Sequence, residues 1–333
     1  MSNAEISTAE DANVTALQPW AQICSVAVLL PCYNEELTIA DVIDGFRKAL
    51  PQARIYVYDN NSSDGTIAAA TEAGAIVRSE NYQGKGNVVR RMLGDIDADI
   101  YVLADGDSTY DPSQASKLIN KLVTENLDMV VGTRDGGGDD AYRRGHQAGN
   151  KAFNWLVAHL FGSGFTDVFS GYRVFSRRFA KSFPVLSSGF EIETELSVHA
   201  LDLQIPAAEV PLPYGARPDG SESKLRTYRD GSRILWVIMK LYRALNPLRF
   251  YGAMGLTLAI IAVALGIPLI VTYLQTGLVP RIPTAVLVMG LLQISVFCLF
   301  SGIILNSISK ARREARRMRF LDIASIGEMR NGR

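Results

Sequence analysis

Two apolar stretches near the C-terminus, residues 250–273 and 285–308, constrain the fold of this chain most, because neither contains a charged residue. An α-helix needs about 20 mostly apolar residues to cross the hydrocarbon core of a bilayer. Each stretch is long enough to cross with some tilt, and only the segment "LQTGLVPRIPT" separates them. A buried core helix can be equally apolar, but two in succession favour a transmembrane helical hairpin.

The charges beside these stretches predict the orientation of the hairpin. Arg243 and Arg249 precede the first stretch, a basic segment at residues 309–320 follows the second, and the connection contains only Arg281. The positive-inside rule places both ends of the hairpin in the cytoplasm, which makes the chain a multi-pass protein of the inner (cytoplasmic) membrane. The basic segment can also lie against anionic lipid headgroups, or it can serve only as a determinant of topology.

The remaining composition excludes several classes of function. Residues 1–19 contain acids but no Lys or Arg, so they do not resemble a signal peptide, and we expect residues 1–20 to form a disordered tail. The 34 basic residues balance the 34 acidic ones, which does not indicate a nucleic acid partner. Cys24, Cys32 and Cys298 show no metal-ligand spacing and fit a reducing cytosol better than a disulfide framework.

The N-terminal portion alternates apolar runs with helical patterns. "ICSVAVLLP" is a nearly continuous apolar run, which is typical of a strand covered on both faces of a sheet. Strand–helix alternation predicts an α/β fold with a mostly parallel sheet and helices on both faces. The expected strands are residues 23–31, 53–59, 75–79, 99–105 and 127–134, and the expected helices are residues 34–50, 64–74, 86–96 and 112–126.

Polar motifs follow four of these strands: "PCYNEE", "DNNSSDGT", "DGD" and "GTR". In open α/β sheets, ligands bind beyond the carboxyl ends of the strands, so these motifs should meet at one edge. Asp105 and Asp107 could there face one hard divalent cation, which could hold a diphosphate through oxygen ligands. A solvent-exposed turn is the alternative reading of "DGD" alone.

The motifs "VLLPCYNEE", "VYDNNSSDGT", "GKGN" and "ADGD", in this order, resemble the nucleotide-sugar half of family 2 glycosyltransferases, which have the GT-A fold. "VGTR", "DVFSGYRVFSR", "GFEIETEL" and "VPLPYGARPDGSESKL" resemble the polyprenyl-phosphate glycosyltransferases, which are the dolichyl-phosphate mannose synthase-like enzymes and their bacterial undecaprenyl-phosphate relatives. The likeness covers roughly residues 25–228, and the two-helix segment suits the bacterial branch.

This resemblance implies an inverting, metal-dependent transfer of a monosaccharide from a nucleotide-sugar donor, with UDP-hexose or UDP-N-acetylhexosamine expected, to a polyprenyl-phosphate acceptor. It implies Mg²⁺ or Mn²⁺ on Asp105 and Asp107. Thr109 stands where mannose synthases often have a Gln, and its hydroxyl could ligate directly or through water. The residues implied for the nucleoside pocket are Pro31, Tyr33, Glu35 and Asp59, and those implied for the donor diphosphate are Lys85, Arg217 and Lys224.

A lipid phosphate is already an anion, so it needs positioning rather than a general base, and the planar fork of arginine suits phosphate. Arg134 and Arg173 lie in family-like contexts, and Arg143 or Arg144 could join them from the Gly-rich segment 135–145, which we expect to be an acceptor loop. If a base acts after all, the available carboxylates are Asp167, Glu191 and Glu193. Hydrogen bonding to sugar hydroxyls, or bracing of a loop, is the expected role of the acids in "GFEIETEL".

Two alternatives remain open: transfer to a sugar or lipid hydroxyl with a carboxylate base, and a non-catalytic membrane scaffold that binds nucleotide sugars. The chain has no Arg-Trp pair, which disfavours polymer synthesis. Membrane lipids are expected partners, and the lone spans favour self-association into a homo-oligomer. The expected organisation is a tail (1–20), a cytoplasmic GT-A domain (21–228), interfacial amphipathic helices (229–249), the hairpin (250–308) and a basic cytoplasmic tail (309–333).

Overall fold

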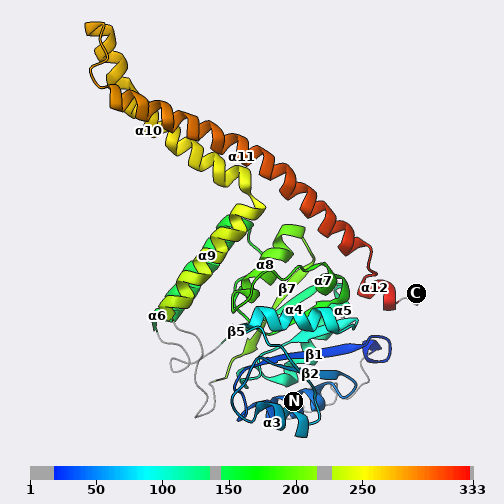
Figure 1. Cartoon of the computed structure of the whole chain (residues 1–333). Helices are drawn as coiled ribbons and strands as arrows, with labels where there is room; N and C mark the ends of the chain where they lie inside the picture. The colour runs from blue at the N-terminus through cyan, green and yellow to red at the C-terminus, as the bar shows by residue number, and fades with distance from the viewer. Residues whose placement is uncertain (1–18, 136–143, 216–226, 331–333) are drawn as a thin grey trace, which may run out of the picture. The chain divides into compact units, whose positions relative to one another are not determined.

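The computed structural model describes residues 19–135, 144–215 and 227–330 (Figure 1). The chain forms two compact units. Met1–Gly231 and Arg317–Arg333 make up the first unit, and Ser232–Arg316 makes up the second.

The first unit is built on a seven-stranded sheet, counted over the described residues, in the order β3-β2-β1-β4-β6-β5-β7. All neighbouring strands pair in parallel except at β6, which is antiparallel to both β4 and β5. This confirms the predicted mostly parallel α/β sheet. The strands are β1 (Val26–Cys32), β2 (Arg54–Asp59), β3 (Ile76–Ser79), β4 (Ile100–Leu103), β5 (Met129–Asp135), β6 (Arg173–Ser176) and β7 (Ala207–Pro213).

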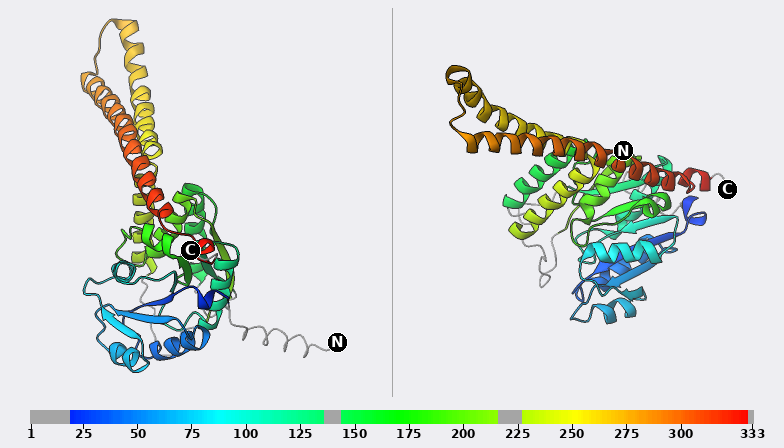
Figure 2. Two further views of the ribbon diagram at one scale, coloured as in Figure 1. Left: turned by 90° about the vertical axis from the view of Figure 1, so that its right-hand side faces the viewer. Right: turned by 45° about the horizontal axis from the view of Figure 1, so that its top comes forward.

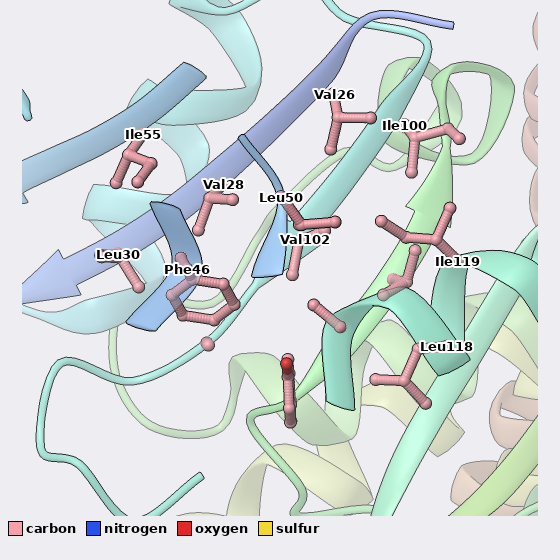
Figure 3. Close-up of a cluster of buried hydrophobic side chains, with 14 of the residues drawn as sticks. Val26, Val28, Leu30, Phe46, Leu50, Ile55, Ile100, Val102, Leu118 and Ile119 are labelled. Carbon is pink, nitrogen blue, oxygen red and sulfur yellow. The ribbon is translucent and has the colours of Figure 1, made fainter. Parts of the chain in front are cut away.

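Helices cover both faces of the sheet. Alternate residues of a strand point to opposite faces, and nearly every residue of β1 and β4 is buried, so both faces are covered. Val26, Val28 and Leu30 of β1 join one hydrophobic cluster with α2 (Ile39–Ala49), α3 (Thr66–Glu72) and α5 (Ala115–Thr124), part of which Figure 3 shows. Helix α4 (Lys85–Asp95) contacts β1 and β2 without contributing to that cluster. The helices of the first unit are η1 (Pro19–Gln22), α2 (Ile39–Ala49), α3 (Thr66–Glu72), α4 (Lys85–Asp95), η2 (Pro112–Gln114), α5 (Ala115–Thr124), α6 (Arg144–Phe161), α7 (Arg177–Ser182), α8 (Ile192–Leu203) and α12 (Ile326–Arg330).

The packed domain begins slightly earlier than residue 21. Trp20 in η1 is 4% exposed and belongs to the main hydrophobic cluster. Its indole Nε1 donates to Asn120 Oδ1 at 2.6 Å. The expected tail over residues 1–18 lies outside the described residues.

The second unit contains most of α9 (Thr227–Leu245), α10 (Pro247–Thr276) and most of α11 (Ile282–Leu321). By length and composition, α10 and α11 could each cross a membrane, and each contains an 18-residue window with a mean hydropathy of 2.5 or 2.3, respectively. They contain the two stretches predicted to cross and run side by side in both views of Figure 2. Gly255 permits close approach of the two helices, because a Cβ at this position would lie 2.9 Å from the carbonyl oxygen of Ser295. Ser295 Oγ donates to the Gly255 carbonyl at 2.8 Å. Such small-residue packing is expected of helices in lipid.

The basic segment after the second stretch is helical, because α11 continues to Leu321. From Arg317 onwards the chain is part of the first unit. Phe320 is 5% exposed beneath the guanidinium of Arg178, at 4.5 Å, and Ile326 joins the main hydrophobic cluster. The C-terminal segment is therefore packed on the domain, in contrast to the expected separate tail.

Candidate active site

The "DGD" motif forms a tightly packed turn beyond β4. Thr38 Oγ1 donates to the carbonyl of Gly106 at 2.7 Å, and a Cβ at Gly106 would lie 2.8 Å from Cys32 Sγ. Asp107 is 4% exposed, whereas the side chain of Asp105 is 29% exposed. A freely solvated turn would not bury a carboxylate in this way, so the geometry favours the binding interpretation.

Thr109 acts on Asp107 in this structure. Its hydroxyl and its backbone N–H both donate to Asp107 Oδ1, at 2.6 and 3.2 Å. A bond of this kind orients a carboxylate that ligates a metal. Direct ligation by Thr109, one of the two options expected from the sequence, is compatible with this bond, because a hydroxyl that donates its proton keeps its oxygen lone pairs.

The two carboxylates fit a hard divalent cation that completes its coordination with other oxygens. Among the described residues no cluster of three His, Cys, Asp or Glu side chains could hold a metal alone. Mg²⁺ commonly binds through one or two carboxylates together with water and substrate phosphates. Asp105 and Asp107 match that pattern.

Lys85 is the cationic centre of the site. Its Nζ contacts Asp105 Oδ1 and lies 2.5 Å from Glu193 Oε1, and its side chain is 9% exposed. Burial alone would lower the pKa of Lys85, but the charges of Asp105 and Glu193 outweigh it and raise that pKa. Burial raises the pKa of Glu193, against the opposing effect of Lys85. Lys85 therefore carries its charge next to the carboxylate expected to bind metal.

Gly171 of the "SGYR" motif also reaches this cluster. A Cβ at Gly171 would lie 2.6 Å from Asp105 Oδ2 and 3.3 Å from Lys85 Nζ. Its N–H donates to Tyr110 Oη at 2.9 Å. A side chain at this position would have to displace the Asp105 carboxylate. The motif alone did not predict this role for Gly171.

The residues expected around the nucleoside meet at the adjacent ends of β1 and β2, where Pro31 pairs with Tyr58 and Cys32 with Asp59. Asp59 is 2% exposed. Its Oδ2 accepts from the N–H of Ser62 at 3.1 Å, while Oδ1 is buried with no hydrogen-bond partner. An unpaired buried acceptor costs free energy unless a ligand satisfies it, so Asp59 is a strong candidate to bind one.

The other two residues expected in the nucleoside pocket follow β1. Tyr33 is 39% exposed, and the N–H of Glu35 donates to Thr66 Oγ1 at 2.8 Å. Asn60, next to Asp59, ties this edge to the Lys85 loop, because its Oδ1 accepts from the N–H of Gly84 at 2.6 Å. The strand ends and the Lys85 loop thus form one connected structure.

Arg134 lies at the end of β5 and pairs with Asp167. Its Nε and Nη2 donate to the two carboxylate oxygens at 2.8 and 2.7 Å, and its guanidinium lies 5.7 Å from the ring centroid of Tyr214. Burial alone would raise the pKa of Asp167, but its bonds with Arg134 outweigh it and lower that pKa. Asp167, one of the three expected candidates for a base, is engaged with a cation here.

Arg173 does not occupy the position expected for an acceptor contact. It is 0% exposed. Its guanidinium donates to the carbonyls of Ser170 and Val168, at 2.8 and 2.9 Å, and to Ser197 Oγ at 3.0 Å. Burial lowers its pKa to about 10. The prediction that Arg173 contacts the lipid phosphate is wrong for this conformation, because its N–H groups bind the protein's own backbone and hydroxyl oxygens.

Several predicted residues cannot be placed. Arg143, Arg217 and Lys224 lie outside the described residues, and Arg144 is described only as part of α6. Glu191 is 5% exposed at the start of α8. Glu195 braces a loop, as expected for the acids of this motif, since its two oxygens accept from the N–H groups of Leu186 and Ser187 at 2.8 and 2.7 Å.

Comparison with known proteins identifies the family. Residues 27–183 match the profile described as Glycosyl transferase family 2. Glycosyltransferase AglJ of Haloferax volcanii is 38% identical over 251 residues, which are 75% of this chain and 82% of that protein. The dolichyl-phosphate hexose transferase of the same organism is 29% identical over 215 residues, covering 65% and 92% of the two chains. The polyprenol monophosphomannose synthase of Mycolicibacterium smegmatis is 26% identical over 208 residues, covering 58% and 78%.

Solved structures confirm the fold. Glucosyl-3-phosphoglycerate synthase from Mycobacterium tuberculosis, crystallised with Mn²⁺, UDP and phosphoglyceric acid, superposes with a TM-score of 0.56 at 25% identity, covering 67% of this chain and 80% of that chain. The same enzyme has also been crystallised with Mg²⁺ and UDP. The first unit thus has the GT-A fold, and the chain belongs to glycosyltransferase family 2.

Proposed function

We propose that this glycosyltransferase moves a monosaccharide from a nucleotide-diphosphate sugar, UDP-hexose or UDP-N-acetylhexosamine, to a polyprenyl phosphate such as undecaprenyl phosphate. The observation that carries the proposal is the contact of Lys85 with Asp105 of the Asp105–Asp107 turn, at the same sheet edge as the buried, unpaired carboxylate oxygen of Asp59. One region there can bind a nucleoside and the adjacent one a diphosphate.

On the donor side, Asp59 Oδ1 would accept a hydrogen bond from a base N–H or a ribose hydroxyl, which would remove the cost of its burial. Pro31, Tyr33 and Glu35 border the same strand ends, and Lys85 faces the diphosphate. Arg217 and Lys224 remain proposed diphosphate contacts from the sequence resemblance.

Asp105 and Asp107 would hold Mg²⁺ or Mn²⁺, with Thr109 orienting Asp107. A bound divalent cation supplies Lewis-acid stabilisation of the charge on the departing nucleoside diphosphate. The related synthase crystallised with Mn²⁺ or Mg²⁺ and UDP supports this choice of metal and nucleotide. Lys85 adds a second positive charge in a water-poor site, where electrostatic stabilisation is strong.

On the acceptor side, we propose that Arg134 orients the lipid phosphate. A phosphate oxygen forms the new bond to the anomeric carbon on the face opposite the leaving group, the bond from that carbon to the diphosphate oxygen breaks, and configuration is inverted. The acceptor oxygen is already anionic, so no proton has to be removed. The names of the two polyprenol- and dolichol-dependent relatives support this acceptor class.

The apolar helices α10 and α11 suit an enzyme whose acceptor resides in a bilayer. We propose that they form a hairpin in the inner membrane with the catalytic domain and both termini in the cytoplasm, because basic residues flank the hairpin and only Arg281 lies in its connection.

The test uses the full chain in detergent with labelled UDP-sugars and either undecaprenyl phosphate or undecaprenol, in the presence of Mg²⁺ or Mn²⁺. Mass spectrometry should detect a glycosylated lipid phosphate and no product from the alcohol. A product from the alcohol would instead support transfer to a hydroxyl. UDP binding without any lipid product would support the nucleotide-sugar-binding scaffold.

A further inference from the structure

A short loop, residues 184–188, lies directly against the glycines that flank Lys85. We call it the brace loop. A Cβ at Gly84 would lie 2.1 Å from the carbonyl oxygen of Ser188, and a Cβ at Gly86 would lie 2.3 Å from that of Ser187. Any side chain at either glycine would displace the loop. In this structure, the two glycines therefore admit protein backbone next to Lys85.

Two charged side chains from different helices hold the brace loop. The carboxylate of Glu195 accepts from the N–H groups of Leu186 and Ser187, at 2.8 and 2.7 Å. The guanidinium of Arg90 donates to the carbonyls of Val185 and Ser187, at 2.9 and 3.2 Å. Arg90 is on α4, the helix that starts at Lys85, and Glu195 is on α8.

The backbone of the brace loop is strained at Val185. This residue is 3% exposed and has φ of +46°, a left-handed conformation that is rare for a β-branched side chain. Such conformations persist only where the surroundings over-determine them, and they cluster at functional sites. The hydrogen bonds from Arg90 and Glu195 provide that constraint.

Helix α8 thus acts on Lys85 in two ways. Glu193 contacts the ammonium group at 2.5 Å, while Glu195 holds the loop that packs beside the Lys85 backbone. Residues two apart in a helix differ in direction by about 200°, so the two glutamates can serve these opposite sides together. Glu195 is 3% exposed, and both of its carboxylate oxygens accept hydrogen bonds from the brace loop.

We propose that Glu195 is a positioning residue that fixes Lys85 against the donor diphosphate through the brace loop. This inference rests on the proposed function in one respect: it takes Lys85 to contact the donor. Glu195 itself touches neither substrate nor metal. Its loss would loosen the Gly84–Gly86 backbone and weaken donor binding, while acceptor binding at Arg134 stays the same.

The first test measures the mechanical link without any ligand. In the full chain in detergent, Glu195→Gln should speed hydrogen–deuterium exchange in peptides that cover residues 84–88 as well as 184–188. Arg90→Gln, a change at an exposed residue that removes the other side of the brace, should do the same. Unchanged exchange in residues 84–88 in both variants would overturn the proposal, whatever the protein catalyses.

The second test measures the consequence for the donor. Glu195→Gln should weaken Mn²⁺-dependent UDP binding by about tenfold in calorimetry, as expected for the loss of bonds to a charged group, and leave the KM for lipid phosphate unchanged. Lys85→Met should weaken binding at least as much, and the double variant should be no weaker than Lys85→Met. Additive losses would show that Glu195 does not act through Lys85 and would overturn the proposal.

Glu209→Gln is the matched control. Glu209 also accepts backbone N–H bonds, from Thr166 at 2.8 Å and Asp167 at 3.2 Å, but on the loop that holds Arg134. The Glu209→Gln variant should leave both UDP affinity and hydrogen–deuterium exchange in residues 84–88 unchanged. Equal effects of the two glutamates on UDP affinity would indicate general loosening and count against the proposal. If wild-type protein does not bind UDP, the proposed function fails, and the exchange measurement still decides the link.

Discussion

Arg134 and Asp167 form a two-point ion pair, with Nε to Oδ2 at 2.8 Å and Nη2 to Oδ1 at 2.7 Å. The two side chains are 16% and 13% exposed, so the pair is largely shielded from solvent. Glu209 supports it by accepting from the N–H of Asp167. The orientation of the guanidinium is therefore fixed by the protein itself, which lowers the entropy cost of binding an anion.

Arg134→Lys should selectively weaken binding of the lipid phosphate acceptor. Lysine keeps the charge but cannot make the planar two-point contact with Asp167 or with a phosphate. We expect the KM for polyprenyl phosphate to rise by about tenfold or more, with Mn²⁺-dependent UDP affinity unchanged. Steady-state kinetics with varied lipid and calorimetry with UDP would measure the two quantities. An unaltered KM for the lipid would refute the role of Arg134.

The pair also predicts how stability depends on pH. Arg134 lowers the pKa of Asp167 below its usual 3.8, so the ionised carboxylate stabilises the folded state above that value. This contribution disappears as the pH falls through the lowered pKa. The difference in Tm between wild type and Asp167→Asn should thus be constant from neutral pH down to about 5 and should shrink below about 4. A Tm difference that grows as the pH falls would contradict the stabilising role of the ionised Asp167 carboxylate.

Asp105→Asn and Asp107→Asn should each abolish metal-dependent donor binding while preserving the fold. Each change removes one anionic oxygen donor from a site with two, so we expect turnover to fall by at least about 100-fold. EDTA should have the same effect on wild type, and added Mn²⁺ should reverse it. Circular dichroism would check the fold.

Asp111→Asn is the control for these two variants. Asp111 is an exposed acid close by in sequence whose carboxylate caps η2 by accepting from the N–H of Ser113 at 2.9 Å. Its substitution should leave Mn²⁺-dependent UDP binding intact. A comparable loss in all three variants would mean that the effect is not specific to the "DGD" carboxylates.

Local sequence patterns predicted the sheet and the meeting of its strand-end motifs, because apolar runs and parallel topology bring Asp59 and Asp105 to one edge. They did not predict that Glu193 would contact Lys85, since no periodicity relates residues so far apart in the chain. The antiparallel β6 was also missed. Its four residues are too short to show a period and lie inside a motif interpreted for chemistry.

Arg173 shows why chemistry inferred from a motif can mislead. An arginine in a glycine-containing motif looks available for phosphate, but here two backbone carbonyls and a hydroxyl satisfy it inside the domain. Burial of a cation depends on long-range packing that no local pattern reports. The family motif "SGYR" contributes Gly171 to the site, while Arg173 holds the loop on which Gly171 lies.

The packing of the C-terminal segment makes a final prediction. Phe320 is 5% exposed under Arg178, and Arg178 pairs with the fully buried Asp128, with Nη2 to Oδ2 at 2.6 Å. Phe320→Ala would leave a cavity and remove the cation–π contact, so it should destabilise the first unit by about 3 kcal/mol. Met318→Ala, two residues away and 60% exposed, should change stability by less than about 0.5 kcal/mol. Thermal unfolding in detergent would compare them. Equal losses of stability in the two variants would contradict the prediction, because only Phe320 has a buried ring whose packing can be lost.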